Sequence, residues 1–241
     1  MLELKNVFVS AKEDDFEIIN NVNLTLDKKK IYVVTGPNGG GKTSLAKAIM
    51  GIYPVSGGEI FLDGKDITDS SITERANMGI GYAFQAPPRF KGLRVRDLLS
   101  IAAREKDEGK LFSLLADVGL CAQDYIDREL NASFSGGELK RVEIASILAR
   151  ELRVALFDEP EAGIDLWSFQ RLTETFKQLN EISETTIVII SHQERILRLA
   201  DEVILICGGK ITDITSPDKI LGDIDYFSEP GCFCPHCFAR K

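Results

Sequence analysis

Residues 36–43 have the types and the spacing of a phosphate-binding loop. They read Gly-Pro-Asn-Gly-Gly-Gly-Lys-Thr and match the pattern G-x-x-x-x-G-K-S/T in full. Glycines let successive backbone N–H groups curve around a phosphate, and a helix that begins here adds the positive end of its dipole. A glycine-rich turn whose lysine faces solvent is the alternative. The expected nucleotide-binding residues are Gly36, Pro37, Asn38, Gly39, Gly40, Gly41, Lys42, Thr43 and Ser44.

Two adjacent carboxylates, Asp158 and Glu159, follow the apolar run 154–157. Such a run predicts a buried parallel strand, and α/β sheets bind ligands at the carboxyl ends of their strands. Asp158 is the expected Mg²⁺-associated acid, together with the hydroxyl of Thr43, and Glu159 is the expected general base. Lys42 is expected to contribute charge to catalysis. The alternative is a strand that simply ends at a solvated Asp-Glu turn.

The sequence Ser135-Gly136-Gly137-Glu138 has two compatible interpretations. It is a capping box, in which the Ser135 and Glu138 side chains satisfy free N–H groups at the start of a helix. It is also an exposed helix N-terminus surrounded by small residues, which is what the docking of a phosphate requires.

Gln85 and His192 each follow a predicted strand. A histidine at that place can donate a hydrogen bond to a γ-phosphate and hold a water in line for attack. Taken singly, a structural histidine and a surface amide are the commoner outcomes for these residue types. Their value as catalytic candidates depends on the motifs around them.

The elements that must position these residues alternate between strands and helices. Short continuous apolar runs predict buried parallel strands at 31–34, 154–157 and 186–190, and helices are expected at 43–50, 138–150 and 169–179. The opening of the chain, 2–9 and 18–26, predicts an antiparallel pair, and further strands are expected at 59–62 and 79–84. Between 94 and 119 the apolar residues recur at helical spacing, which predicts a helical insert.

Composition sets the class of protein. The 241 residues include 44% hydrophobic and 27% charged residues, which is ordinary for one packed domain. No apolar run approaches the ~20 residues of a membrane span, and the first residues lack a secretory signal, so we expect a cytoplasmic protein without direct membrane insertion. A net charge of −8 makes nucleic acid an unexpected partner. Cys121 and Cys207 lie in apolar contexts, where a buried reduced thiol is expected.

Taken in order, these motifs resemble those of ABC-type ATPases. Ser135–Glu138 resembles the signature motif, Gln85 the Q-loop glutamine that touches Mg²⁺, and His192 the switch histidine; residues 162–165 resemble the D-loop. The resemblance implies a P-loop NTPase core of α/β class with an N-terminal antiparallel β subdomain and a helical subdomain, about 86–150, inserted between Q-loop and signature motif. It also implies hydrolysis of MgATP in a transient head-to-tail homodimer, and an aromatic that stacks on adenine, for which Phe16 and Phe8 are the candidates.

Three local segments narrow the resemblance to the ATPase of the Suf iron–sulfur cluster assembly system. They are 83–88 (AFQAPP), 134–141 (FSGGELKR) and 191–197 (SHQERIL). The segment between Gln85 and Ser135 is shorter than in the better-known Suf ATPases, which points to a divergent, minimal version. This resemblance implies a soluble scaffold protein as partner. The nucleotide-binding subunit of a membrane transporter and a non-hydrolysing ATP-dependent clamp are the competing interpretations.

The last residues depart from the ABC pattern. We expect the ATPase domain to occupy 1–222 and a cysteine-rich tail to occupy 223–241. Clustered Cys and His side chains are borderline-soft ligands that suit Zn²⁺ or an iron–sulfur cluster, completed by a partner or a second copy. A redox-sensitive tail without metal is equally expected. The possible ligands are Cys232, Cys234, His236 and Cys237.

Overall fold

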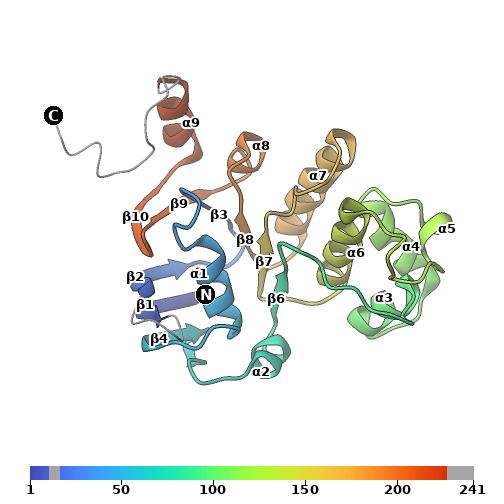
Figure 1. Cartoon of the computed structure of the whole chain (residues 1–241), viewed down its shortest axis with the longest axis horizontal. Coiled ribbons are helices and arrows are strands. Elements are labelled where there is room, and N and C mark those ends of the chain that lie inside the picture. Colours follow the sequence, from blue (N-terminus) through green and yellow to red (C-terminus); the bar gives the residue numbers. More distant parts are fainter. Residues whose placement is uncertain (11–16, 227–241) are drawn as a thin grey trace.

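A computed structural model describes residues 1–10 and 17–226, and Figure 1 shows two sheets flanked by helices. Phe16 and the possible metal ligands of the tail lie outside the described residues. The elements alternate along the chain as the apolar runs predict. The fold class expected from the motifs is therefore confirmed, and its parts are described below.

The N-terminal part forms a four-stranded antiparallel sheet with strand order β2-β1-β4-β5. Strand β1 (Leu2–Ser10) pairs with β2 (Glu17–Leu26) on one side and with β4 (Gly57–Leu62) on the other. The short β5 (Lys65–Asp66) completes the edge. Apolar side chains such as Leu2 and Leu26 are fully buried on one face, where they pack over the second sheet's core. This is the predicted antiparallel subdomain.

The second sheet carries the motifs and has the order β10-β9-β3-β8-β7-β6. Its parallel strands are β6 (Ile80–Ala83), β7 (Val154–Asp158), β8 (Thr186–Ile190), β3 (Ile31–Thr35) and β9 (Glu202–Cys207), and β10 (Lys210–Thr215) pairs antiparallel with β9. Every residue of β3, β7 and β8 is buried, because helices or the other sheet cover both faces. The carboxyl ends of β3, β6 and β7 therefore lie along one edge of the sheet.

Helices follow the motif-bearing strands. Helix α1 (Lys42–Met50) follows the glycine-rich loop, and α7 (Leu166–Ile182) follows β7. The predicted helix at 169–179 begins earlier, at Leu166, because Asp165 accepts hydrogen bonds from the backbone of Trp167 and Ser168 and so caps it. The remaining short helices are α2 (Ile72–Asn77), α8 (Glu194–Leu197) and α9 (Pro217–Tyr226).

A helical unit separates β6 from β7. It consists of α3 (Val95–Ala103), α4 (Glu108–Asp117), α5 (Ala122–Tyr125) and α6 (Gly136–Leu148), drawn in green to olive in Figure 1. Helix α6 starts two residues before the predicted 138, at the capping box of Ser135. Buried leucines of α3 and α4, including Leu99 and Leu115, pack with α6 in the same apolar cluster as the sheet. The unit is thus packed on the sheet through α6 and on α7 through the end of α4, where Thr175 Oγ1 donates to the Asp117 carbonyl at 2.6 Å.

Two expectations about single features can be compared with the structure. Across the described ranges, no helix is long and apolar enough to cross a membrane. The expectation that Cys121 is buried is wrong: it is exposed, because it stands at the N-cap of α5 at the surface of the helical unit. Cys207 is half-buried at the end of β9.

Candidate functional site

The glycine-rich loop between β3 and α1 wraps around its own lysine. Lys42 Nζ donates hydrogen bonds to the carbonyl oxygens of Gly36 at 2.8 Å and Pro37 at 3.0 Å. Gly36 has φ 143, and a Cβ there would lie 2.0 Å from the Ile206 carbonyl oxygen, so no other residue fits. Burial lowers the pKa of Lys42, opposed by the negative charges of Glu159 and Asp158. The loop thus has the curvature and the positive charge of an anion site.

Asp158 lies at the end of β7 and is completely buried. It accepts hydrogen bonds from Thr43 Oγ1 at 3.2 Å and from the Tyr82 hydroxyl at 2.9 Å. Burial and the nearby charge of Asp158 raise the pKa of Tyr82, which therefore stays a neutral donor. Hard oxygen ligands such as the Thr43 hydroxyl and the Asp158 carboxylate suit Mg²⁺ beside phosphate oxygens, so the donor set fits this ion.

Glu159 is positioned by the backbone and by Gln85. Its φ of 45 turns the chain sharply at the end of β7, and its N–H donates to the Ile190 carbonyl at 3.0 Å. Gln85 Nε2 donates to Glu159 Oε2 at 2.8 Å. The structure therefore joins Gln85 to the predicted base.

His192 is exposed immediately after β8. The preceding residue, Ser191, is fully buried; its hydroxyl donates to the carboxylate of Glu161 and accepts from the N–H of Gln193 at 3.0 Å. Burial raises the pKa of Glu161, and the hydrogen bond from Ser191 opposes that shift. This local network determines the path of the backbone on both sides of His192.

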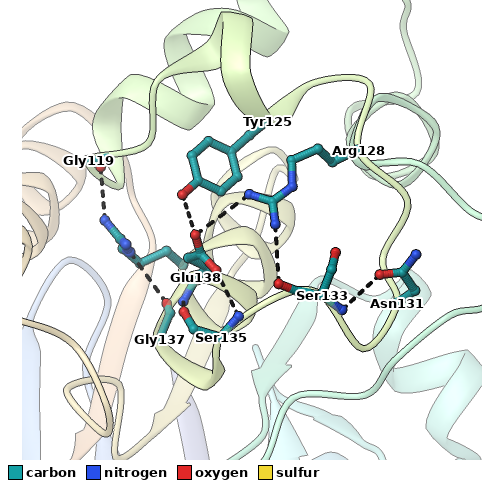
Figure 2. Close-up of polar contacts among 9 residues, drawn as sticks. Gly119, Tyr125, Arg128, Asn131, Ser133, Ser135, Gly137 and Glu138 are labelled. Carbon is teal, nitrogen blue, oxygen red and sulfur yellow. Dashed lines mark hydrogen bonds and ion pairs between the residues drawn. The ribbon is translucent and has the colours of Figure 1, made fainter.

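The signature segment forms the capping box that the sequence predicts, as Figure 2 shows. Ser135 Oγ accepts from Glu138 N at 3.2 Å, and Glu138 Oε2 accepts from Ser135 N at 2.7 Å. The other carboxylate oxygen accepts from the Tyr125 hydroxyl and lies 3.6 Å from Arg128 NH1. The Tyr125 hydrogen bond, followed by those from Ser135 and by Arg128, lowers the pKa of Glu138 to about 2.

The signature segment also contacts the D-loop. A Cβ at Gly137 would lie 2.1 Å from the Gly163 carbonyl oxygen, so only glycine permits this approach of the two backbones. Asp165, two residues later, caps α7. The signature segment and the phosphate-binding loop are not brought together, and Figure 1 shows α1 and α6 well apart with β6 and β7 between them.

Several residues of this site were missed in the sequence. Tyr82 donates to the predicted Asp158, and the only available signal for it was a polar hydroxyl in an apolar strand just before Gln85. Ser191 and Glu161 bond to each other beside the predicted His192 and Glu159 in the sequence. Of the two adenine-stacking candidates, Phe8 is half-buried on β1 opposite Gly57. Within the described part of the chain, no group of three or more His, Cys, Asp or Glu side chains could hold a metal.

A family model described as ABC transporter matches residues 19–162, which include the loop, Gln85, the signature segment and both carboxylates. The chain belongs to the ABC transporter ATPase family. It is an ATP hydrolase of that family, which uses ATP with Mg²⁺.

Relatives of this ABC ATPase cover most of its length. An uncharacterized ABC transporter ATP-binding protein of Methanocaldococcus jannaschii is 39% identical over 213 residues, 85% of each chain. A probable ATP-dependent transporter, ycf16, of Cyanidium caldarium is 32% identical over 229 residues, covering 88% of this chain and 89% of the relative.

Solved structures show the same fold. The dimeric post-hydrolysis state of an ATP-binding cassette bound to ADP and Pi superposes with a TM-score of 0.82 at 23% identity, covering 90% of this ABC ATPase and 99% of that chain. A bacterial Atm1-family ABC exporter with ATP bound gives 0.82 at 21% identity, with 92% of this chain and 40% of the exporter chain covered. At these identities the likeness concerns the fold alone.

Proposed function

We propose that this ABC ATPase is the motor subunit of a Suf-type iron–sulfur cluster assembly complex, in which ATP binding and hydrolysis change the conformation of a scaffold protein. The main support for a partner is an apolar groove that is lined by Phe84, the residue directly before Gln85. The roles of the site residues, the dimer and the partner are argued in turn below.

We assign the following role to each site residue. The loop from Gly36 to Thr43, with Ser44, holds the phosphates, and Lys42 neutralises the charge that develops on them. Thr43 and Asp158 would hold Mg²⁺, which would supply positive charge to offset the negative charge of the phosphates. Glu159 accepts a proton from the attacking water, and Gln85, bonded to Glu159, orients that water. His192 donates a hydrogen bond to the γ-phosphate.

The signature segment acts on a second copy of the chain. Its helix N-terminus is held by the capping box, yet Ser135 and Gly136 are exposed and lie away from the loop of their own chain. An ATP-binding cassette with the same fold is described as dimeric. In the head-to-tail dimer that we propose for this chain, such a surface faces the ATP of the other subunit. We propose that ATP forms this dimer transiently.

The groove beside the Q-loop is suited to a partner segment. It has a volume of about 140 Å³, and its two exposed aromatic residues are Phe84, 39% exposed, and Phe90, 42% exposed. Exposed Arg89 and Lys91 flank Phe90. An amphipathic segment with an aromatic or aliphatic anchor and acidic flanks fits these features. Because Phe84 directly precedes Gln85, a partner seated here acts on the catalytic residues through one peptide bond.

The partner class is inferred from local sequence. The segments 83–88, 134–141 and 191–197 resemble the Suf ATPase, and two of them adjoin the groove and the signature helix. A membrane transporter subunit is the second candidate, since relatives are named as transporter ATP-binding proteins. We further propose a cytoplasmic location. For the tail, beyond the described residues, we propose Zn²⁺ or an iron–sulfur cluster on Cys232, Cys234, His236 and Cys237.

Anaerobic affinity capture from native extract, followed by mass spectrometry, tests the partner. The chain is compared with Phe90→Asp, which puts a charge in the groove, and with Ile101→Asp, a matched change at a residue that is 68% exposed on α3. We expect a Suf-type scaffold to be retained by the native chain and by Ile101→Asp, and lost with Phe90→Asp. If a multi-span membrane protein is instead retained by the native chain and Ile101→Asp and lost with Phe90→Asp, the chain is a transporter subunit and the Suf role is wrong.

A further inference from the structure

Lys140 is a lysine buried as completely as any core residue. It lies on α6, one turn after the signature segment, and its exposed fraction is 1%. An ammonium group is expensive to remove from water unless hydrogen bonds and charges compensate it. Its contacts therefore show what the residue does.

The ammonium of Lys140 joins the ends of two neighbouring strands. Nζ donates to the carbonyl oxygen of Phe84, just after β6, and to that of Asp158 at 2.9 Å, the last residue of β7. The parallel ladder between β6 and β7 ends at the pair Ala83 and Phe157. Phe84 and Asp158 each come one residue after that last pair. The Lys140 side chain therefore bridges the two chain segments at the point where their hydrogen-bonded pairing stops.

A second side chain of α6 holds the same residue, Phe84, through its N–H group. Glu143 Oε1 accepts from Phe84 N at 2.9 Å, and Glu143 Oε2 lies 3.8 Å from Lys140 Nζ. Both polar backbone groups of Phe84 are thus held by α6. Glu143 is 8% exposed, and among the described residues its Oε2 has no hydrogen-bond donor. Burial raises the pKa of Glu143 to about 7, opposed by the hydrogen bond from Phe84 and by the nearby charge of Lys140.

The two held positions are the ones that direct the catalytic side chains. Phe84 precedes Gln85, and Asp158 precedes Glu159, and those two side chains share a hydrogen bond of 2.8 Å. Helix α6 therefore connects the capping box at its start to the backbone from which Gln85 and Glu159 project. A small rotation of α6 would therefore shift the backbone at Phe84 and Asp158, which precede Gln85 and Glu159.

Resting on the dimer and the catalytic roles proposed above, we propose that Lys140 and Glu143 are positioning residues. They transmit the docking of the signature segment on another subunit's ATP to Gln85 and Glu159 of their own subunit. Neither residue touches substrate. Each acts through the backbone of Phe84 or Asp158. Hydrolysis of the ATP bound by one subunit therefore depends on whether the other subunit also holds ATP.

A purely structural role predicts a different outcome for the same substitutions. Replacing a buried ion pair by well-packed apolar residues is often neutral or stabilising. If the pair serves only the fold, Lys140→Met combined with Glu143→Met leaves hydrolysis unchanged. If the pair positions Gln85 and Glu159, the same double variant folds but hydrolyses slowly, because the two strand ends are no longer held.

The test measures kcat, the equilibrium Kd for MgATP and the Tm of Lys140→Met and of the double variant. Lys177→Met, at an exposed lysine of α7, is the matched control. We expect kcat of both test variants to fall about 10- to 100-fold, as for other misplaced catalytic groups, with Kd within about twofold of the native value. The control keeps its native kcat.

Two results would overturn the inference. One is a double variant with a native Tm and a kcat within about twofold of the native chain. The other is failure of the double variant to fold, which would show that the pair is required for the structure. Should Lys140→Met alone be unstable because it leaves Glu143 unpaired, the double variant decides.

Discussion

Gln85 and Glu159, which stand 74 positions apart in the sequence, share a hydrogen bond of 2.8 Å between Nε2 and Oε2. Parallel pairing of β6 with β7 brings the carboxyl ends of these strands side by side. The amide therefore orients the carboxylate that we propose as the general base. A partner that displaces Phe84, the neighbour of Gln85, would change the orientation of the base.

Glu159→Gln is expected to bind MgATP but to hydrolyse it at least about 100-fold more slowly, because the amide cannot accept a proton from water. Since ATP persists, the variant should accumulate as a dimer of about twice the 26.7 kDa chain mass. Light scattering coupled to size exclusion, with and without MgATP, measures this. Turnover at the native rate would contradict the assignment of the base.

Tyr82→Phe removes a hydrogen bond of 2.9 Å to the fully buried carboxylate of Asp158. We expect the free energy of unfolding to fall by about 1.5–3 kcal/mol, the range for hydrogen bonds to charged groups. Urea denaturation measures it. Tyr53→Phe, at a tyrosine whose ring lies 5.2 Å from Lys47 Nζ, is the control and should change it by less than about 0.5 kcal/mol. If Tyr82→Phe lowers the free energy of unfolding no more than Tyr53→Phe does, the Tyr82 hydroxyl contributes nothing to stability.

The depressed pKa of Glu138 predicts a pH dependence of stability. Its folded-state pKa is about 2 against an ordinary 4.5, so the ionised form is favoured in the folded chain. This contribution is fully present above pH 4.5 and is lost as the pH falls toward 2. We expect Glu138→Gln to lower Tm near neutral pH and the difference to shrink below about pH 4.5. A pH-independent difference would rule out ionisation as the cause.

Trp167 offers a direct signal of dimer formation. It is the sole tryptophan of the sequence, it is 80% exposed, and it follows Leu166, which is 57% exposed. Both residues adjoin the D-loop, whose Gly163 contacts Gly137 of the signature segment. Addition of MgATP to Glu159→Gln should reduce acrylamide quenching of its fluorescence, since the second copy covers this face. If the mass of the Glu159→Gln protein doubles while the quenching of Trp167 fluorescence stays unchanged, the dimer interface lies on another face.

The contiguous motifs could be predicted from sequence because their physics is local. The loop at 36–43, the capping box at 135–138 and the pair Asp158 and Glu159 depend on neighbours in the chain. The buried strands β3, β7 and β8 were found for the same reason, since each is a continuous apolar run. The order of these strands in the sheet required the structure.

Residues that act through distant contacts could not be found in this way. Lys140 reads as an ordinary helical lysine, and only the approach of Phe84 and Asp158 explains its burial. Gly137 reads as part of a motif, although its need to be glycine comes from Gly163, 26 positions later. Cys121 was misjudged because an apolar neighbourhood in sequence does not determine which face of a short helix meets solvent.

The most direct test of the composite site mixes two inactive variants. Lys42→Ala removes the charge from the phosphate-binding loop, and Ser135→Arg blocks the signature segment. Each alone should be inactive, whereas a mixed head-to-tail dimer contains one site with an intact loop and an intact signature segment. Half of the dimers in an equal mixture are mixed, and each has one intact site, so independent sites would give about one quarter of the native rate. We predict activity above that of either variant alone but below this quarter, because the second site of the mixed dimer cannot be occupied. A mixture no more active than the separate variants would contradict a site shared between two chains.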